Sequence, residues 1–191
     1  YVALSSAVKS LAVKLTKVCN DLRLLASGPR TGLSELILPQ LQPGSSIMPG
    51  KVNPVIPEVT NQAAFLAIGL DTTVMLASSA GQLELNVMEP VITFALYMQM
   101  KVMTNACNHL REKCIDGIVV NAEHCKDLVM GSLGIITILK PHFGYKPCAN
   151  IAREGFLTGN QLVVEEKQML TQEQWDKVFT YENLINPKFE K

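Results

Sequence analysis

The residue types best suited to chemistry in this chain lie in segment 44–54, whose sequence is Gly-Ser-Ser-Ile-Met-Pro-Gly-Lys-Val-Asn-Pro. Its two glycines make the backbone pliable, as in a lid that closes over a binding site. Lys51 offers a fixed positive charge to a carboxylate, and Asn53 can both donate and accept hydrogen bonds. The segment therefore predicts a loop that binds a small anion.

A serine of this loop is a candidate general base. The helix expected to begin near Pro54 directs its free N–H groups toward the loop and favours negative charge there. In that field a serine hydroxyl loses its proton more easily, and the resulting alkoxide can take a proton from a substrate. No His or Asp lies nearby in the sequence to form a conventional triad, although triad partners need not be sequence neighbours.

Two other interpretations compete with an active-site loop. A phosphate-binding GxxxxGK[ST] loop is excluded, because Pro49 stands where the second glycine is needed, counted from Gly44, and Val52 follows Lys51 in place of Ser or Thr. A flexible surface linker is the interpretation that remains possible, and spacing alone slightly favours it.

Glu58 has two interpretations as well. It either favours the N-terminus of the next helix, or it orients a catalytic histidine located elsewhere.

Three long helices are predicted around this loop. Apolar residues recur at helical spacing in 1–25, and Gly28-Pro29 ends that helix. A loop rich in Gly, Pro and Ser follows over 27–53, and further helices are expected over 54–79 and 89–113. The second helix is apolar nearly all round, which is typical of a helix buried in the middle of a bundle or in an oligomer core.

The segments become shorter after Gly117, and glycines and prolines interrupt them. We therefore predict two domains, a helical-bundle segment over 1–120 that carries the loop and a small helical domain over 121–191. Thr171 is expected to cap a helix over 172–179. No sustained alternation of apolar and polar residues indicates strands, so the predicted fold class is all-α.

Composition and charge exclude several classes of function. Basic and acidic residues balance at 17 each, so we expect no nucleic-acid partner. No apolar run reaches the ~18 residues of a membrane span, so no membrane partner is expected. The chain begins at Tyr1 without Met and without the basic start of a secretory signal. We expect it to be a piece of a longer, cytoplasmic protein.

Metal and disulfide chemistry find little support in the sequence. The cysteines are odd in number, form no CxxC pair and combine with none of the three histidines in a metal-ligand spacing. Buried free thiols in a reducing cytosol are the favoured interpretation, and a disulfide or a zinc site is the alternative. The cysteines concerned are Cys19, Cys107, Cys114, Cys125 and Cys148.

The residues of segment 44–53 match the GSSxMPxKxN signature of the fumarase/aspartase superfamily at every defined position. Segments 20–30 and 81–87 also resemble that superfamily, so the likeness extends over almost the whole chain. Within the superfamily the chain most resembles its aspartate ammonia-lyase branch. The residues that carry this finer resemblance lie in segments 86–92, 104–107 and 112–118.

The resemblance implies a mechanism and roles for residues of the loop. The reaction is a reversible anti elimination of ammonia from L-aspartate, which gives fumarate through an enediolate intermediate. Ser45 would be the general base, and Lys51 and Asn53 would bind the substrate carboxylate. Glu58 would pair with a histidine from another subunit. The residues that would line the site when the loop closes are Ser46, Ile47 and Met48.

The resemblance also implies an assembly. Members of the superfamily are homotetramers with a central bundle of long helices, and three subunits contribute to each active site. This chain resembles only the C-terminal portion, so the site would also need the N-terminal portion of the same enzyme. No cofactor is implied; divalent-metal activation is known for some members, but no ligand cluster is visible in the sequence. The alternatives are a fumarate hydratase acting on L-malate and fumarate, or a non-catalytic helical assembly protein of the same superfamily.

Overall fold

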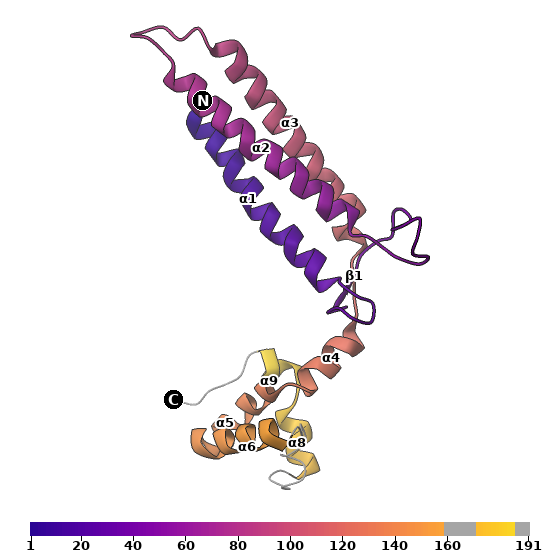
Figure 1. Cartoon of the computed structure of the whole chain (residues 1–191). Helices are drawn as coiled ribbons and strands as arrows, with labels where there is room; N and C mark the ends of the chain where they lie inside the picture. The colour runs from indigo at the N-terminus through magenta and orange to yellow at the C-terminus, as the bar shows by residue number, and fades with distance from the viewer. Residues whose placement is uncertain (159–170, 186–191) are drawn as a thin grey trace. The chain divides into compact units, whose positions relative to one another are not determined.

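The computed structural model describes residues 1–158 and 171–185 (Figure 1). The chain divides into two compact units, Tyr1–Asn121 and Ala122–Lys191. Helices dominate the described residues, and the strands found among them are two of two residues each. The predicted all-α class is therefore confirmed.

Three long helices run side by side in the first unit (Figure 1). They are α1 (Val2–Leu25), α2 (Val55–Ser79) and α3 (Glu89–Lys113), each within one residue of its predicted bounds. Prolines stand at the start of the last two helices, where a missing N–H leaves no hydrogen bond unmade. The helices predicted from periodicity are confirmed.

Small side chains bring the three helices together. Ala12 of α1 packs against Ala64 and Ala67 of α2, with Met103 of α3 beside them. Small residues at the contact let helix backbones approach closely, whereas an aromatic core would hold them apart. Two further clusters lie along the bundle. One contains Val74, Ala77, Ile92, Ala95 and Leu96, and the other contains Cys19, Leu110 and Cys114.

The loop between α1 and α2 is more ordered than its composition predicts. Strand β1 (Leu36–Ile37) lies within it and pairs antiparallel with β2 (Val119–Val120). Asn121 N–H extends the pairing by donating to Glu35 O at 3.0 Å. The loop predicted over 27–53 therefore contains a short strand that the sequence did not indicate, because a two-residue ladder is too short to leave an alternating pattern.

The second unit consists of short helices around its own core. A 3₁₀ turn, η1 (Ile115–Gly117), precedes β2 in the first unit. The second unit then contains α4 (Ala122–Met130), η2 (Leu133–Leu139), α5 (Lys140–Phe143), α6 (Tyr145–Thr158), α8 (Gln172–Val178) and α9 (Tyr181–Ile185). Its core contains Ile136, Ile138, Leu139, Cys148, Ile151 and Val178.

Thr171 caps α8 as predicted. Its Oγ1 accepts a hydrogen bond from Gln174 N–H at 3.3 Å, and Gln174 Oε1 accepts one from Thr171 N–H at 2.9 Å. The reciprocal pair is a capping box, which satisfies backbone donors that the first turn leaves free. The helix ends at Val178, one residue before the predicted end.

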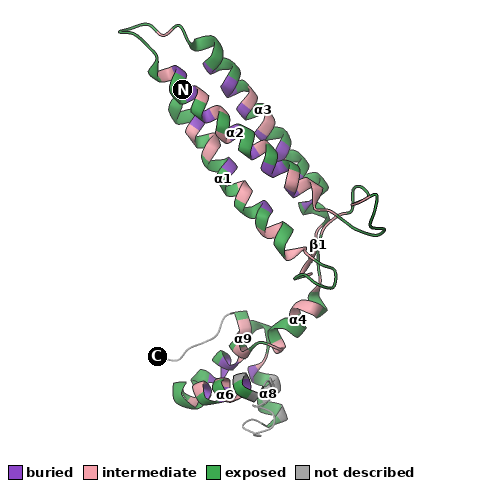
Figure 2. Cartoon of the chain, viewed as in Figure 1, coloured by how far each residue is buried: buried purple, intermediate pink, exposed green. Residues whose placement is uncertain are grey.

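Much of the apolar surface of α2 is exposed in the single chain (Figure 2). By length and composition α2 is also the one helix in the described ranges that could cross a membrane, with a mean hydropathy of 1.2. Polar residues such as Asn61 and Asp71 interrupt α2, so it still contains no uninterrupted apolar run of membrane-spanning length. The buried face of α2 contains Asp71 as well as alanines that pack against its neighbours, as expected of a helix inside a bundle.

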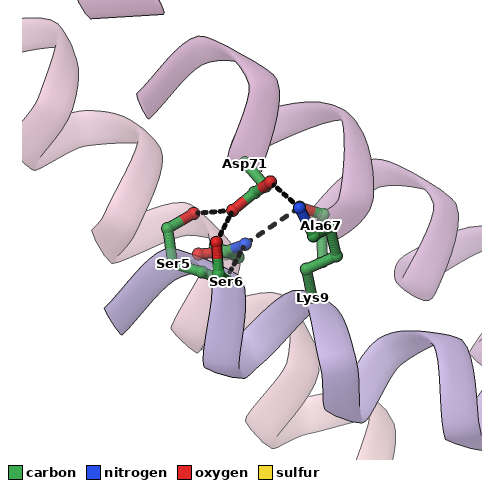
Figure 3. A network of polar contacts seen from close by, with 6 residues as sticks. Ser5, Ser6, Lys9, Ala67 and Asp71 are labelled. Atoms are coloured by element: carbon green, nitrogen blue, oxygen red, sulfur yellow. Dashed lines mark hydrogen bonds and ion pairs between the residues drawn. The ribbon is translucent and has the colours of Figure 1, made fainter. Parts of the chain in front are cut away.

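A polar network joins α2 to the N-terminal part of α1 (Figure 3). Asp71, which is 5% exposed, accepts hydrogen bonds from Ser5 Oγ at 2.7 Å and Ser6 Oγ at 3.3 Å. Its second oxygen pairs with Lys9 Nζ. Gln99 of α3 donates from Nε2 to Ser5 O at 3.2 Å and so connects the third helix. Buried polar groups that are paired in this way favour one register of the helices.

Replacing Asp71 is expected to destabilise the protein in a pH-dependent way. Burial alone would raise the pKa of Asp71, but hydrogen bonds from Lys9 and Ser5 outweigh it and lower the pKa. The carboxylate therefore adds stability above its unfolded pKa, and this contribution is lost as pH falls through the lowered folded pKa. Asp71→Asn should reduce the free energy of unfolding by about 1–3 kcal/mol at pH 7.

Urea unfolding at pH 7 and under strongly acidic conditions measures this effect. The difference in the free energy of unfolding between the wild type and Asp71→Asn should become smaller in acid. Asp21→Asn is the matched control, because the Lys17–Asp21 pair is exposed and should contribute within about 0.5 kcal/mol. A gap that stays constant down to acidic pH would contradict the assigned role of the carboxylate.

Candidate active site

The loop over 44–53, called here the signature loop, is closed at its base by two hydrogen bonds. Gly44 N–H donates to Lys51 O at 2.9 Å, and Asn53 Nδ2 donates to Gly44 O at 2.8 Å. A Cβ atom at position 44 would lie 2.2 Å from Lys51 O, which is closer than real contacts allow. Only glycine fits there, and Asn53 has a structural role that its spacing in the sequence did not indicate.

The hydroxyl of Ser45 receives two backbone donors. Ile47 N–H and Met48 N–H each donate to Ser45 Oγ, both at 3.1 Å. Two N–H groups aimed at one oxygen stabilise negative charge on it, as in an oxyanion hole. The geometry can therefore support an alkoxide at Ser45, and its role as a general base stays a prediction.

A groove of about 380 Å³ lies beside the base of the signature loop. Lys51 and Asn53 line it, together with residues that follow α1, among them Gly28, Pro29 and Ser34. Residues 45–48, all of them described, are not among its lining residues. Lys51 and Asn53 thus share the groove, whereas Ser45, Ser46, Ile47 and Met48 do not line it, although Lys51 N–H donates to Met48 O at 3.2 Å.

The tip of the signature loop is open to solvent. Ile47 is 86% exposed and Met48 is 52% exposed. We expect the loop to close over a substrate bound at Lys51, which is a common step in enzymes with mobile lids. The predicted binding roles of Ser46, Ile47 and Met48 depend on that closure and stay predictions.

Glu58 lies in the first turn of α2, where a carboxylate favours the helix N-terminus. Its Oε1 lies 3.8 Å from Arg23 Nη2 on α1, a contact that the sequence did not suggest. Of the chain's histidines, His109 lies on α3, and His124 and His142 belong to the second unit. The predicted pairing of Glu58 with a histidine of another subunit stays a prediction.

Within the described ranges, no group of three or more His, Cys, Asp or Glu side chains is arranged to hold a metal ion. All five cysteines are free thiols. Burial, helped by the nearby thiol of Cys114, raises the pKa of Cys19 to about 11, so its thiol is neutral at pH 7. Burial also raises the pKa of Cys114 and Cys148. These buried thiols act as small apolar groups in the core.

Comparison with known proteins places the signature loop in a family. Residues 1–69, which include the loop, match a family model described as lyase, and residues 135–186 match one described as fumarase C C-terminus. The chain is 52% identical to an aspartate ammonia-lyase of Helicobacter pylori over 189 residues, which is 98% of this chain. It is 51% identical to that of Escherichia coli over 99% of this chain.

The chain belongs to the fumarase/aspartase superfamily. Solved structures of this superfamily share the fold. One is a fumarate lyase:delta crystallin from Brucella melitensis, with a TM-score of 0.87 and 44% identity over 93% of this chain. Another is a class II fumarase from Schistosoma mansoni, with a TM-score of 0.86 and 34% identity over 98% of this chain. The resemblance carried by the signature loop is confirmed.

The match covers a minor part of each relative. The chain spans 40% of the length of the two ammonia-lyases. It covers 39% of the Brucella chain and 40% of the Schistosoma chain. The match to the fumarase C C-terminus agrees with the prediction that the sequence corresponds to a C-terminal portion of a superfamily enzyme.

Proposed function

We propose that this chain is the C-terminal portion of an aspartate ammonia-lyase, a carbon–nitrogen lyase that converts L-aspartate reversibly into fumarate and ammonia. The observation that carries the proposal is the pair of amide donors at Ser45 Oγ, in a loop with the full superfamily signature. The names of relatives about half identical over nearly the whole chain support the choice of substrate.

The first step is removal of a proton from Cβ of L-aspartate. Ser45, as an alkoxide held by the N–H groups of Ile47 and Met48, takes the proton and becomes a neutral hydroxyl. The electron pair of the C–H bond moves onto the adjacent carboxylate and forms an enediolate. Because Lys51 lies in the groove at the base of the loop, it is suited to stabilise the added negative charge.

The second step is loss of ammonia. The electron pair of the enediolate returns to form the Cα–Cβ double bond, and the C–N bond breaks on the opposite face. Asn53 donates a hydrogen bond to the same carboxylate from the Nδ2 hydrogen that Gly44 does not use. The closed loop brings Ser46, Ile47 and Met48 over the substrate and excludes water.

The site is completed by other chains. In the proposal the protein is a cytoplasmic homotetramer, and a histidine of another subunit pairs with Glu58. Large apolar side chains exposed on α2, such as Phe65, Leu66 and Leu76, support burial against further helices. Gly69 lies among them, and among the described residues a Cβ there would meet nothing within 4 Å apart from the adjoining turns of its own helix, which leaves room for a second helix.

The test uses the full-length protein with L-aspartate and L-malate as alternative substrates. We expect fumarate absorbance to rise with aspartate, and light scattering of the same preparation to give the mass of a tetramer. Fumarate hydratase is the second candidate, favoured by the likeness to the Schistosoma mansoni fumarase. Turnover of malate alone would establish the hydratase, and turnover of neither substrate would favour a non-catalytic assembly protein.

A further inference from the structure

Four polar side chains join α1 to α2 near the end of the bundle that carries the signature loop. Asn20 and Arg23 lie three residues apart on α1, and Glu58 and Asn61 lie three residues apart on α2. Residues three apart on a helix share a face, so the pair on α1 can contact the pair on α2.

Arg23 is held between its own helix and the carboxylate of Glu58. Asn20 Oδ1 accepts a hydrogen bond from Asn61 Nδ2 at 2.8 Å and a long one from Arg23 Nη1 at 3.4 Å. The other terminal nitrogen, Arg23 Nη2, lies 3.8 Å from Glu58 Oε1. Asn61 is buried at 4% exposure, so it supplies the fixed point to which the more exposed Arg23 is tied through Asn20.

The ion pair between Arg23 and Glu58 is too exposed to contribute much to the free energy of unfolding. The side chains of Arg23 and Glu58 are 42% and 37% exposed, and exposed ion pairs usually contribute between zero and about 1 kcal/mol. We therefore consider its effect on the position of the Glu58 carboxylate. A guanidinium stays charged at any pH at which an enzyme works, so it attracts the Glu58 carboxylate throughout that range, here through one contact of 3.8 Å to Oε1.

We propose that Arg23 is a positioning residue for Glu58, and this inference rests on the function proposed above. In that function Glu58 orients a histidine from another subunit. Arg23 engages Oε1 of Glu58 and thereby directs Oε2 toward the histidine. The sequence Asn-Asp-Leu-Arg at 20–23 then serves the active site from a helix that contributes no group to the substrate.

The experiment is a double-mutant cycle on the full-length enzyme, with Arg23→Gln, Glu58→Gln and both together. We expect Arg23→Gln to lower kcat roughly tenfold and to leave KM within about twofold. Arg23→Lys should recover part of this loss. In the Glu58→Gln background, Arg23→Gln should cause no further loss, because its effect passes through Glu58.

Lys17→Gln is the matched control, since Lys17 is a basic residue of α1 whose ion pair with Asp21 is exposed. It should leave kcat unchanged. The positioning role would be overturned if the losses of kcat in the two single variants added up in the double variant. It would also be overturned if a lower melting temperature accounted for the loss of kcat in Arg23→Gln. Unchanged turnover in Glu58→Gln would overturn it too, while leaving the elimination at Ser45 intact. Absence of aspartate turnover in the wild type would overturn both proposals.

Discussion

Ser45→Ala is expected to reduce aspartate turnover roughly 100- to 10,000-fold, the range over which a positioned general base acts. The substitution removes the one oxygen that receives both loop amides, Ile47 N–H and Met48 N–H, each at 3.1 Å. Alanine offers no group that can take the Cβ proton. The loss should appear in kcat, whereas KM should change little, because the substitution leaves Lys51, the proposed ligand of the carboxylate, in place.

Two measurements separate a lost base from a damaged loop. Exchange of the Cβ proton of the substrate with solvent should stop in Ser45→Ala, since this exchange reports proton transfer alone. Ser46→Ala is the matched variant, because Ser46 is the neighbouring hydroxyl and is exposed in the open loop. A larger loss of turnover in Ser46→Ala than in Ser45→Ala would show that Ser46 is the base. Equal activity of Ser45→Ala and the wild type would show that Ser45 is not the base.

The long helices could be predicted because their signals are local. Gly28-Pro29 follows α1, prolines begin α2 and α3, and apolar residues recur at helical spacing between these points. The contacts that fix the bundle are not local. Ser5 and Asp71 are 66 positions apart, and the sequence shows only that Asp71 is an acidic residue inside an apolar helix.

The candidate site could be predicted in kind but not in arrangement. Spacing alone indicated a pliable anion-binding loop and slightly favoured a linker, and the signature shared with the superfamily decided between them. The ladder between β1 and β2 joins positions more than eighty residues apart, so the sequence of the loop alone did not predict it. The approach of Arg23 to Glu58 likewise depends on the packing of α1 against α2, which helical periodicity does not specify.

Gly44→Ala is expected to lower activity about 100-fold, the size of loss that a shift of about 1 Å in a positioned group can cause. The added Cβ would lie 2.2 Å from Lys51 O and 2.6 Å from Lys51 C. Both atoms belong to the backbone, so no rotamer change relieves the clash. The loop base must open, which breaks the bond from Gly44 N–H to Lys51 O and displaces Lys51 from the groove.

Stability should hardly change in Gly44→Ala, because the loop is largely exposed and contributes little to the core. The loss should therefore appear in kcat/KM at an unaltered melting temperature. Gly81→Ala is the matched control, because a Cβ there meets only ordinary contacts at 3.5 Å or more. If Gly44→Ala kept full activity, the hydrogen-bonded base of the loop would not be what positions Lys51, and the groove seen in the open structure would not be the carboxylate site.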